Sequence, residues 1–338
     1  ENFSINEEAL RAYFPLEHVL KGLKSILQAL FGIHFEKTQD TSWHEDVMVF
    51  NLYKEGQDNA FAQIYMDLYN RQGKQSGAWM NGLSTHLDTK NHKQLPIGLL
   101  CCNFRKMQKG QPSLLSHDDV VTLFHEFGHN LHHILSNVPY LEISGLNQVA
   151  WDFVELPSQW FEFYAWDPKT LKTLSCHYQT TKPLDSKTIE NLIASKNSFS
   201  GMQTQRQVYM ALLDLKIHQD CPSSLEALID ISTKLNHQYQ QFQSPDTNRL
   251  LHHFLHLFGG GYAAGYYSYH YAQIMASDVF ACFEATQTLD AQTAVKLEET
   301  ILAIGGSKPA DKAFKDFKGR NPTIDALLRH TGLVKADA

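Results

Sequence analysis

The chain has 338 residues, of which 43% are hydrophobic and 12% aromatic, so it can bury one large core or two modest ones. Its formal net charge of −7, from 29 basic and 36 acidic residues, leaves no positive excess for binding the phosphate backbone of a nucleic acid. No apolar run reaches the roughly 18 residues of a membrane-spanning helix, and the first residues lack a signal-peptide pattern, so we expect a cytoplasmic protein that contacts neither nucleic acid nor membrane.

Residues 1–45 predict a helical lead-in. Ser4, with Glu7 three residues later, fits a capping box, which marks the start of a helix. Gly32 predicts the end of the helical pattern, because glycine readily adopts the left-handed conformation that closes a helix. Between these points, apolar residues recur at helical spacing: Leu16, Val19, Leu20, Leu23, Ile26, Leu27 and Leu30.

Residues 46–105 predict a small β-sheet. The segments 47–53 and 60–69 are rich in β-branched and aromatic residues, and the polar segment between them predicts a hairpin. The segments 78–80 and 97–104 have an extended pattern as well, which brings the expected sheet to about four strands.

The rest of the chain is almost entirely helical in pattern, which makes the expected fold mainly α with the small sheet packed to one side. Its first helix begins at Ser116, where Asp119 completes a capping pattern, and an apolar stripe predicts that one side of this helix is buried. At about 100° per residue, His125, His129 and His132 share a narrow arc opposite the stripe. We therefore expect these three histidines to face a cleft.

Residues 125–129 read His-Glu-Phe-Gly-His, a known zinc-binding pattern. Its spacing puts the imidazoles of His125 and His129 on one face of a helix, at the separation that two ligands of a tetrahedral zinc ion require. Glu126 would lie beside a zinc-bound water and act as its general base. The competing interpretation is a helix whose histidines are simply solvated, and the context of the motif disfavours it.

A third protein ligand must come from another part of the chain, and we expect it to be Glu155. This glutamate lies in the strongly apolar stretch 151–160, far enough from His125 for the chain to turn and return alongside. Asp152 would share its face and orient a histidine ligand, although a purely structural role is an equal alternative. Pro157 predicts a kink or a late helix start. The alternative for Glu155 is an ordinary surface glutamate.

These segments resemble the paired zinc signature of the thimet oligopeptidase and oligopeptidase A metallopeptidases. The resemblance is carried by residues 125–129 and by Asp-Phe-Val-Glu-Leu-Pro-Ser-Gln at 152–159, extends over essentially the whole chain, and is strongest to the bacterial oligopeptidase A branch. It implies a helical zincin of the gluzincin type, in which the two histidines and Glu155 bind one Zn²⁺ per chain and Glu126 is catalytic. Family chains also have an N-terminal helical region, absent here, that forms the opposite wall of a deep channel.

The glycine- and tyrosine-rich segment 259–269 resembles the flexible loop that lies near the metal in that family. A tyrosine hydroxyl in such a loop, from Tyr266 or Tyr269, would donate a hydrogen bond to the oxyanion of the reaction, and the glycines would let the loop close. The alternative is a glycine-rich helix junction with core tyrosines. The resemblance implies that the following residues contact the substrate: His256, Gly260, Gly261, Tyr262 and Tyr269.

Residues 77–80 resemble the strand along which family members lay the substrate backbone, so Ala78 and Trp79 are expected to bind substrate at a sheet edge. The residues alone are equally compatible with a strand that carries a core tryptophan.

We expect a monomeric zinc-dependent endopeptidase that hydrolyses internal bonds of short oligopeptides. One catalytic region, 1–338, would comprise the helical lead-in 1–45, the sheet 46–105 and a helical zinc-binding and substrate region 116–338. The alternative is a peptide-binding fragment that retains zinc but turns over little, because the N-terminal channel wall is missing. Another helical zinc hydrolase, such as an aminopeptidase, would need a group that holds a free substrate amine, and no motif for one is evident.

Overall fold

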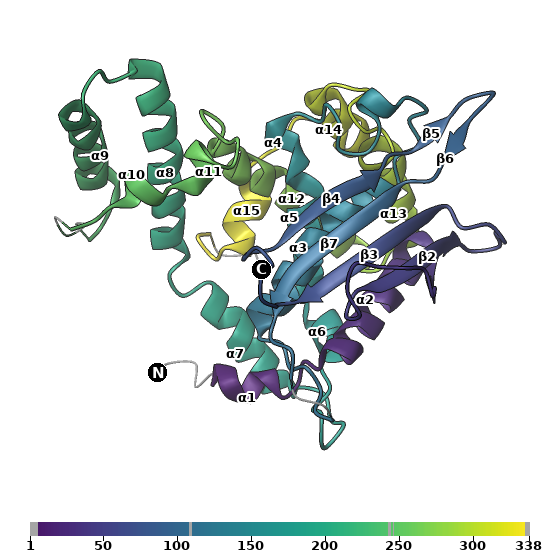
Figure 1. Cartoon of the computed structure of the whole chain (residues 1–338). Helices are drawn as coiled ribbons and strands as arrows, with labels where there is room; N and C mark the ends of the chain where they lie inside the picture. Colours follow the sequence, from purple (N-terminus) through teal and green to yellow (C-terminus); the bar gives the residue numbers. More distant parts are fainter. Residues whose placement is uncertain (1–5, 108–109, 243–244, 246, 335–338) are drawn as a thin grey trace.

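The computed structural model describes residues 6–107, 110–242, 245 and 247–334, and it is mainly helical with one small mixed sheet (Figure 1). The α-helices are α1 (Glu7–Arg11), α2 (Leu16–Phe31), α3 (His117–Ile134), α4 (Trp151–Val154), α5 (Leu156–Glu162), α6 (Pro168–Leu174), α7 (Ser186–Lys196), α8 (Ser200–Asp220), α9 (Leu225–Tyr239), α10 (Leu250–His253), α11 (Leu255–Phe258), α12 (Tyr267–Ala285), α13 (Ala291–Leu297), α14 (Ala310–Lys318) and α15 (Asp325–His330). Short 3₁₀ helices span Leu141–Ile143 and Phe163–Ala165, and a π-helical turn spans Glu298–Leu302. The strands are β1 (Ile33–Lys37), β2 (Met48–Lys54), β3 (Ala62–Tyr69), β4 (Trp79–Ser84), β5 (Leu87–Asp88), β6 (Lys93–Gln94) and β7 (Ile97–Phe104). This architecture confirms the predicted fold class.

The main sheet has five strands in the order β1-β2-β3-β7-β4. The predicted hairpin is confirmed, because β2 and β3 pair antiparallel with Phe50 opposite Ile64. Among the described strands, only β3 and β7 run parallel, and β4 pairs with β7 alone, so β4 forms one edge of the sheet. The strands β5 and β6 form a separate two-stranded ribbon.

The predicted helical lead-in needs two corrections. Ser4 lies outside the described residues, and α1 instead begins after Asn6, whose side chain accepts a hydrogen bond from the backbone N–H of Ala9 at 3.2 Å. Gly32 does end α2, in the left-handed conformation with φ 61°. The turn at Gly32 then brings Ile33 opposite Lys54, so β1 lies inside the segment predicted to be helical. Five residues directly after a long helix are too few to show a strand pattern of their own.

The main core lies between the sheet and the helices that cover one of its faces. Helix α3 packs against β7 and β4 on one side and against α5 on the other, while α2 packs on β1. Leu23, Phe124, Phe127 and Trp160 are fully buried in this core. Because α3 is enclosed on both sides, the residues it carries are held between the sheet and α5.

A second, smaller core lies in a helical arm formed by α8 to α11. Figure 1 shows α8 and α9 side by side, projecting away from the sheet. Leu213, Ile217, Phe254 and Leu257 are buried in this arm together with Tyr266, which precedes α12. The chain therefore returns from the arm to the main body through the predicted tyrosine loop. None of the described helices is long and apolar enough to span a membrane.

Candidate metal centre

The start of α3 is fixed by a reciprocal cap. The Ser116 hydroxyl accepts a hydrogen bond from the backbone N–H of Asp119 at 3.0 Å, and the Asp119 carboxylate accepts one from the backbone N–H of Ser116 at 2.8 Å. This arrangement is the predicted capping box. It sets the register of the helix, and hence the direction in which His125, Glu126 and His129 project roughly two and a half to three and a half turns later.

Helices α3 and α5 approach closely because residue 128 is a glycine. A Cβ atom at Gly128 would lie 2.5 Å from both the carbonyl oxygen of Pro157 and the Cα of Ser158, closer than real atoms come. The break between α4 and α5 falls at Glu155, with Pro157 in the first turn of α5, as predicted from the proline. The close approach and the break together bring Glu155 to the two histidines.

His125, His129 and Glu155 form one cluster. Glu155 Oε2 lies 3.3 Å from His125 Nε2 and 3.2 Å from His129 Nε2, and the ligand atoms of the three residues all lie within 4.8 Å of one another. Ligands bound tetrahedrally to zinc at about 2.0–2.1 Å are separated by roughly 3.3 Å, so this spacing suits a zinc ion. Two imidazoles and a carboxylate are also a donor set typical of catalytic zinc. The structure thus brings the three predicted ligands together.

Surrounding side chains hold the ligands in this orientation. Glu162 Oε1 lies 2.6 Å from His125 Nδ1, which leaves Nε2 of that ring directed at the cluster. The Tyr262 hydroxyl donates to Glu155 Oε1 at 2.8 Å, and the Ser158 hydroxyl donates to Glu155 Oε2 at 3.0 Å. Carboxylates that bond the far nitrogen of a histidine ligand fix its ring and increase its basicity.

The residue that orients a histidine is therefore Glu162, and the prediction of Asp152 for this role is wrong. Asp152 bonds neither histidine among the described residues and instead lines a surface pocket with Tyr271 and Asp311. Glu155, at the end of α4, is buried beside the histidines, whereas Asp152 in the same short helix is packed toward α12 and the surface pocket. Glu162 lies two turns after Glu155 along α5, and that seven-residue spacing in the sequence is the signal that could have revealed it.

Burial and charge set the protonation of the cluster. Burial alone would raise the pKa of Glu155, but the adjacent His129 and His125 outweigh it and hold that pKa well below 4.5. Burial lowers the pKa of His125, and hydrogen bonds to Glu155 and Glu162 overcome this and raise it well above 6.5. Glu126 is 7% exposed, and its burial raises its pKa above 4.5 despite the nearby histidines. Glu155 is thus charged, as the predicted role of metal ligand requires, and the pKa of Glu126 is shifted toward the range of a general base.

His132 does not face a cleft, contrary to the sequence-based expectation. It is fully buried, and neither of its ring nitrogens has a hydrogen-bond partner within the described part of the chain. Burial lowers the pKa of His132 to about 3, so the ring is neutral at physiological pH. The face of α3 that carries His125 and His129 becomes buried toward the C-terminal end of the helix, where His132 lies.

The segment 259–269, predicted to be a loop, contributes two rings near the cluster, although its last residues form the first turn of α12. Tyr262, whose hydroxyl reaches Glu155, stacks on Tyr269 with ring centroids 4.8 Å apart. Burial, and then the charge of Glu155, raise the pKa of Tyr269, so its hydroxyl stays protonated and able to donate. The Tyr266 hydroxyl instead donates to Gln207 of α8 at 3.0 Å, in the core of the arm. The structure brings Tyr269, and not Tyr266, to the candidate metal centre.

Asp214 of α8 anchors this loop. Its carboxylate is completely buried and accepts hydrogen bonds from the backbone N–H groups of Ala264 and Tyr266, each at 2.8 Å. Ala264 has φ 56°, a left-handed conformation that a residue with a Cβ atom rarely adopts, so the anchor holds a strained turn in place. His218, one turn along α8, lies 2.9 Å from the same carboxylate. Sequence reasoning missed Asp214.

The remaining predicted site residues lie around this centre. Gly261 has φ 82° and packs near Trp151. The ring of Trp151 lies edge-on to the ring of Tyr262, with the two ring centroids 4.6 Å apart. The backbone N–H of Gly260 donates to the carbonyl of Leu255 at 2.7 Å. His256 belongs to α11, and its side chain lies outside the described part of the structure.

The predicted substrate strand is the edge strand β4. Trp79 begins β4 and Ala78 directly precedes it, packed against the main core. Farther along, Gly82 lies so close to His133 of α3 that a Cβ atom there would be 2.5 Å from the ring. The open edge is therefore fixed against the same helix that carries His125 and His129.

The profile of Peptidase family M3 matches residues 1–333. The chain belongs to this family. It is 37% identical over 334 residues to oligopeptidase A of Escherichia coli K12, a match that covers 98% of this chain and 49% of that protein. It is 35% identical over 348 residues to a protein of Arabidopsis thaliana named probable cytosolic oligopeptidase A, covering 99% of this chain and 50% of the relative. The chain thus spans about half the length of these relatives, and the predicted family resemblance is confirmed.

Solved structures show the same fold at low sequence identity. The M32 carboxypeptidase of Deinococcus radiodurans R1 superposes with a TM-score of 0.60 at 13% identity, covering 97% of this chain and 61% of that one. This likeness supports the helical fold with its small sheet.

Proposed function

We propose that this chain is a zinc-dependent endopeptidase that hydrolyses internal bonds of short oligopeptides. The observation that carries the proposal is the convergence of His125, His129 and Glu155 beside the buried Glu126. Membership of Peptidase family M3 and the similarity to oligopeptidase A support the same reaction class.

His125, His129 and Glu155 would hold the zinc ion, which supplies Lewis acidity for the scissile carbonyl and lowers the pKa of water when it is bound. Glu126 then takes the proton of the attacking water and later delivers it to the leaving amine. The raised pKa of Glu126 suits both steps, because a group that titrates nearer to neutral pH can accept a proton and release it again.

Tyr269 is the tyrosine that we assign to the oxyanion. It lies against Tyr262 near Glu155, and its raised pKa keeps the donor proton in place. Replacing Tyr269 by Phe should lower kcat by about 10²–10³ with little change in KM, as expected when a donor to the oxyanion is lost. Tyr266→Phe, which removes a hydroxyl that donates to Gln207 in the arm, should have a much smaller effect on kcat.

The substrate backbone would pair with the open edge of β4, where Ala78 and Trp79 lie. Edge pairing selects extended peptides and uses main-chain hydrogen bonds, so it tolerates varied sequences. We propose a cytoplasmic location, in line with the similarity to the probable cytosolic oligopeptidase A of Arabidopsis. The monomeric state stays a prediction, which light scattering would test.

The deciding experiment measures cleavage of a short internally quenched peptide by the purified chain, with and without a chelator. We expect chelator-sensitive cleavage that returns when zinc is added and is lost in the Glu126→Gln variant, which should still bind zinc. Stoichiometric zinc without any cleavage would reject the endopeptidase activity of this chain and favour a zinc-retaining, peptide-binding fragment. Absence of zinc binding would reject the ligand assignment itself.

A further inference from the structure

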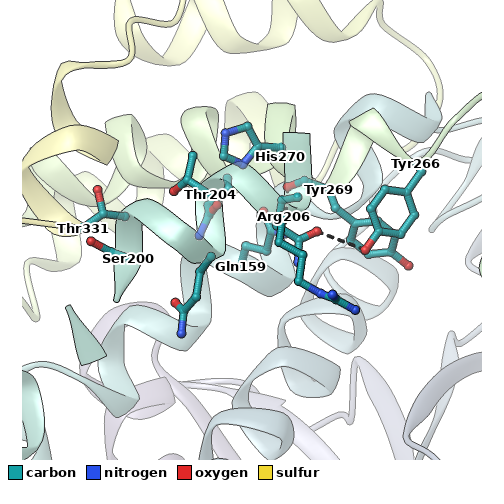
Figure 2. A pocket seen from close by; sticks show the side chains of 11 residues that line it. Gln159, Ser200, Thr204, Arg206, Tyr266, Tyr269, His270 and Thr331 are labelled. Atoms are coloured by element: carbon teal, nitrogen blue, oxygen red, sulfur yellow. Dashed lines mark hydrogen bonds between the residues drawn. The ribbon is translucent and has the colours of Figure 1, made fainter. Parts of the chain in front are cut away.

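A second cavity adjoins the candidate metal centre. Figure 2 shows this pocket, which has a volume of about 550 Å³ and walls formed by α5, α8 and α12. The described residues that line it are uncharged hydrogen-bonding side chains, two tyrosines, His270 and Arg206, and none of them is an aspartate or glutamate. In a chain of net charge −7, a pocket that has an arginine and lacks acidic side chains is a local positive site.

Arg206 is available to a ligand. It makes no ion pair or hydrogen bond with any residue that the structure describes, although many other basic side chains of the chain are paired. It lies beside Tyr266, as Figure 2 shows; burial raises the pKa of that tyrosine, and the positive charge of Arg206 acts against this rise. A guanidinium group presents several N–H donors in a plane, which matches the two oxygens of a carboxylate.

The pocket also offers an acceptor. The side-chain Oε1 of Gln159 is buried and has no hydrogen-bond partner among the described residues, while its Nε2 donates to the backbone carbonyl of Tyr269 at 3.0 Å. A buried acceptor without a partner is costly, so a ligand N–H group would satisfy it. One ligand that carries both an N–H group and a carboxylate is a peptide.

The pocket and the metal-ligand cluster share a wall. Tyr269 lines the pocket, its ring stacks on Tyr262, and the Tyr262 hydroxyl bonds to Glu155. Gln159 belongs to α5, the helix that begins directly after Glu155. A peptide bound at the cluster could therefore extend past Tyr269 into the pocket.

We propose that this pocket is a subsite for a carboxylate of the peptide substrate, with Arg206 as its cationic binding residue. The carboxylate would come from an acidic side chain or from the C-terminus of the peptide. The inference rests on the proposed peptidase function and adds a preference to it: peptides with a carboxylate at the matching position bind more tightly than their uncharged counterparts.

The test uses matched quenched peptides and three proteins: the unaltered chain, Arg206→Gln, and the control Lys216→Gln. Lys216 lies on the same helix but pairs with Asp220 on the exposed surface, outside the pocket. One peptide set carries Asp or Asn at each position in turn, and a second set has a C-terminal carboxylate or amide. We expect one carboxylate to lower KM by about tenfold in the unaltered chain and in Lys216→Gln, and to give no advantage in Arg206→Gln. The position of the effect distinguishes the side-chain source from the C-terminal source.

The proposal is overturned if no carboxylate changes KM in the unaltered chain, or if Arg206→Gln raises KM equally for the charged and uncharged member of each pair. If no peptide is cleaved at all, the proposed peptidase activity is rejected, but the proposed subsite is not. The subsite is then tested by measuring the binding of the same peptides by fluorescence anisotropy. A carboxylate-dependent Kd that is lost in Arg206→Gln then supports the subsite, and an unchanged Kd rejects it.

Discussion

Glu162 Oε1 lies 2.6 Å from Nδ1 of His125, while Nε2 of the same ring lies 3.3 Å from Glu155 Oε2. The ring is thus held between two carboxylates that come from the break before α5 and from its last turn. One carboxylate is placed to share a metal with the ring, and the other orients the ring. This relationship makes α5 the second half of the candidate centre, equal in importance to the motif on α3.

Removing Glu162 should weaken zinc binding without removing a ligand. We expect Glu162→Ala to lower zinc affinity by about 10–100-fold, because His125 loses the acceptor that orients its ring. Glu162→Gln keeps an acceptor oxygen, so its zinc affinity should lie between those of the unaltered chain and Glu162→Ala. Competition with a chromophoric chelator measures this. Asp152→Ala is the matched control and should leave the affinity unchanged; equal losses in the Glu162 and Asp152 variants would contradict the assignment.

A methyl group at Gly128 should force α3 and α5 apart. The added Cβ would meet the backbone of Pro157 and Ser158 at 2.5 Å, and backbone atoms cannot rotate away. We expect Gly128→Ala to lower the free energy of unfolding by about 1–3 kcal/mol and to weaken zinc binding. Chemical denaturation of the two proteins measures the difference.

The control for this substitution is Gly201→Ala, also in a helix, where the added Cβ would meet only Leu333 at an ordinary 3.5 Å. Alanine is the better helix former by about 1 kcal/mol, so this variant should be as stable as the unaltered chain or slightly more stable. A stable Gly128→Ala protein with normal zinc affinity would show that the two helices can separate without cost.

Asp214→Asn should loosen the tyrosine loop while leaving the metal ligands in place. An asparagine presents one acceptor oxygen where the carboxylate presents two, so one of the N–H groups of Ala264 and Tyr266 loses its partner. We expect faster hydrogen exchange in residues 259–266 and a fall in kcat/KM of about tenfold, with little change in zinc affinity, because Tyr262 bonds Oε1 of Glu155 and not the Oε2 that faces the histidines. Asp220→Asn, an exposed change on the same helix, should alter neither hydrogen exchange, nor kcat/KM, nor zinc affinity. If residues 259–266 of Asp214→Asn exchange as slowly as in the unaltered chain, Asp214 does not anchor this segment.

Glu284 should make folding stability depend on pH in the acid range. Burial would raise the pKa of this carboxyl, but hydrogen bonds from His330 and Arg329 outweigh it and lower the pKa to about 2. The unfolded chain, with the ordinary value of 4.5, binds the proton first as pH falls, so this stabilisation is complete above about pH 4.5 and is lost between there and about pH 2.

The measurement is the free energy of unfolding by denaturant between pH 7 and the lowest pH at which the chain stays folded. Glu284→Gln should reduce the slope of stability against pH below pH 4.5 by up to one proton's equivalent, about 1.4 kcal/mol per pH unit. Identical slopes in both proteins would show that the ion pair does not form in solution.

Much of the candidate centre could be predicted because its signals are local. The spacing of His125 and His129 follows from the geometry of a single helix, and an acidic residue in an apolar stretch pointed to Glu155. Capping by Ser116 and the interruption at Pro157 are also decided within a few residues, and the structure confirms both. The hairpin of β2 and β3 followed from alternation on either side of a polar turn.

Other features depended on how distant segments pack. His132 shares the arc of the two histidine ligands but is buried, because only the tertiary structure decides how far a helix is covered. Asp152 and Glu162 are both acidic and both near Glu155 in sequence, and the packing of α5 against α3 decided that Glu162 is the one that reaches His125.

The sequence by itself determined which residues have the chemistry for a metal centre, since residue type and helical spacing are properties of the chain alone. Only the tertiary structure decided which of the loop tyrosines lies near that centre. Tyr266 and Tyr269 are three residues apart in the sequence, yet the first bonds to Gln207 in the arm, and the second, in the first turn of α12, stacks on Tyr262, whose hydroxyl bonds to Glu155. The physical reason is that the buried carboxylate of Asp214 on α8 holds the backbone N–H groups of Ala264 and Tyr266, which keeps Tyr266 in the arm, while Tyr269 follows in the first turn of α12.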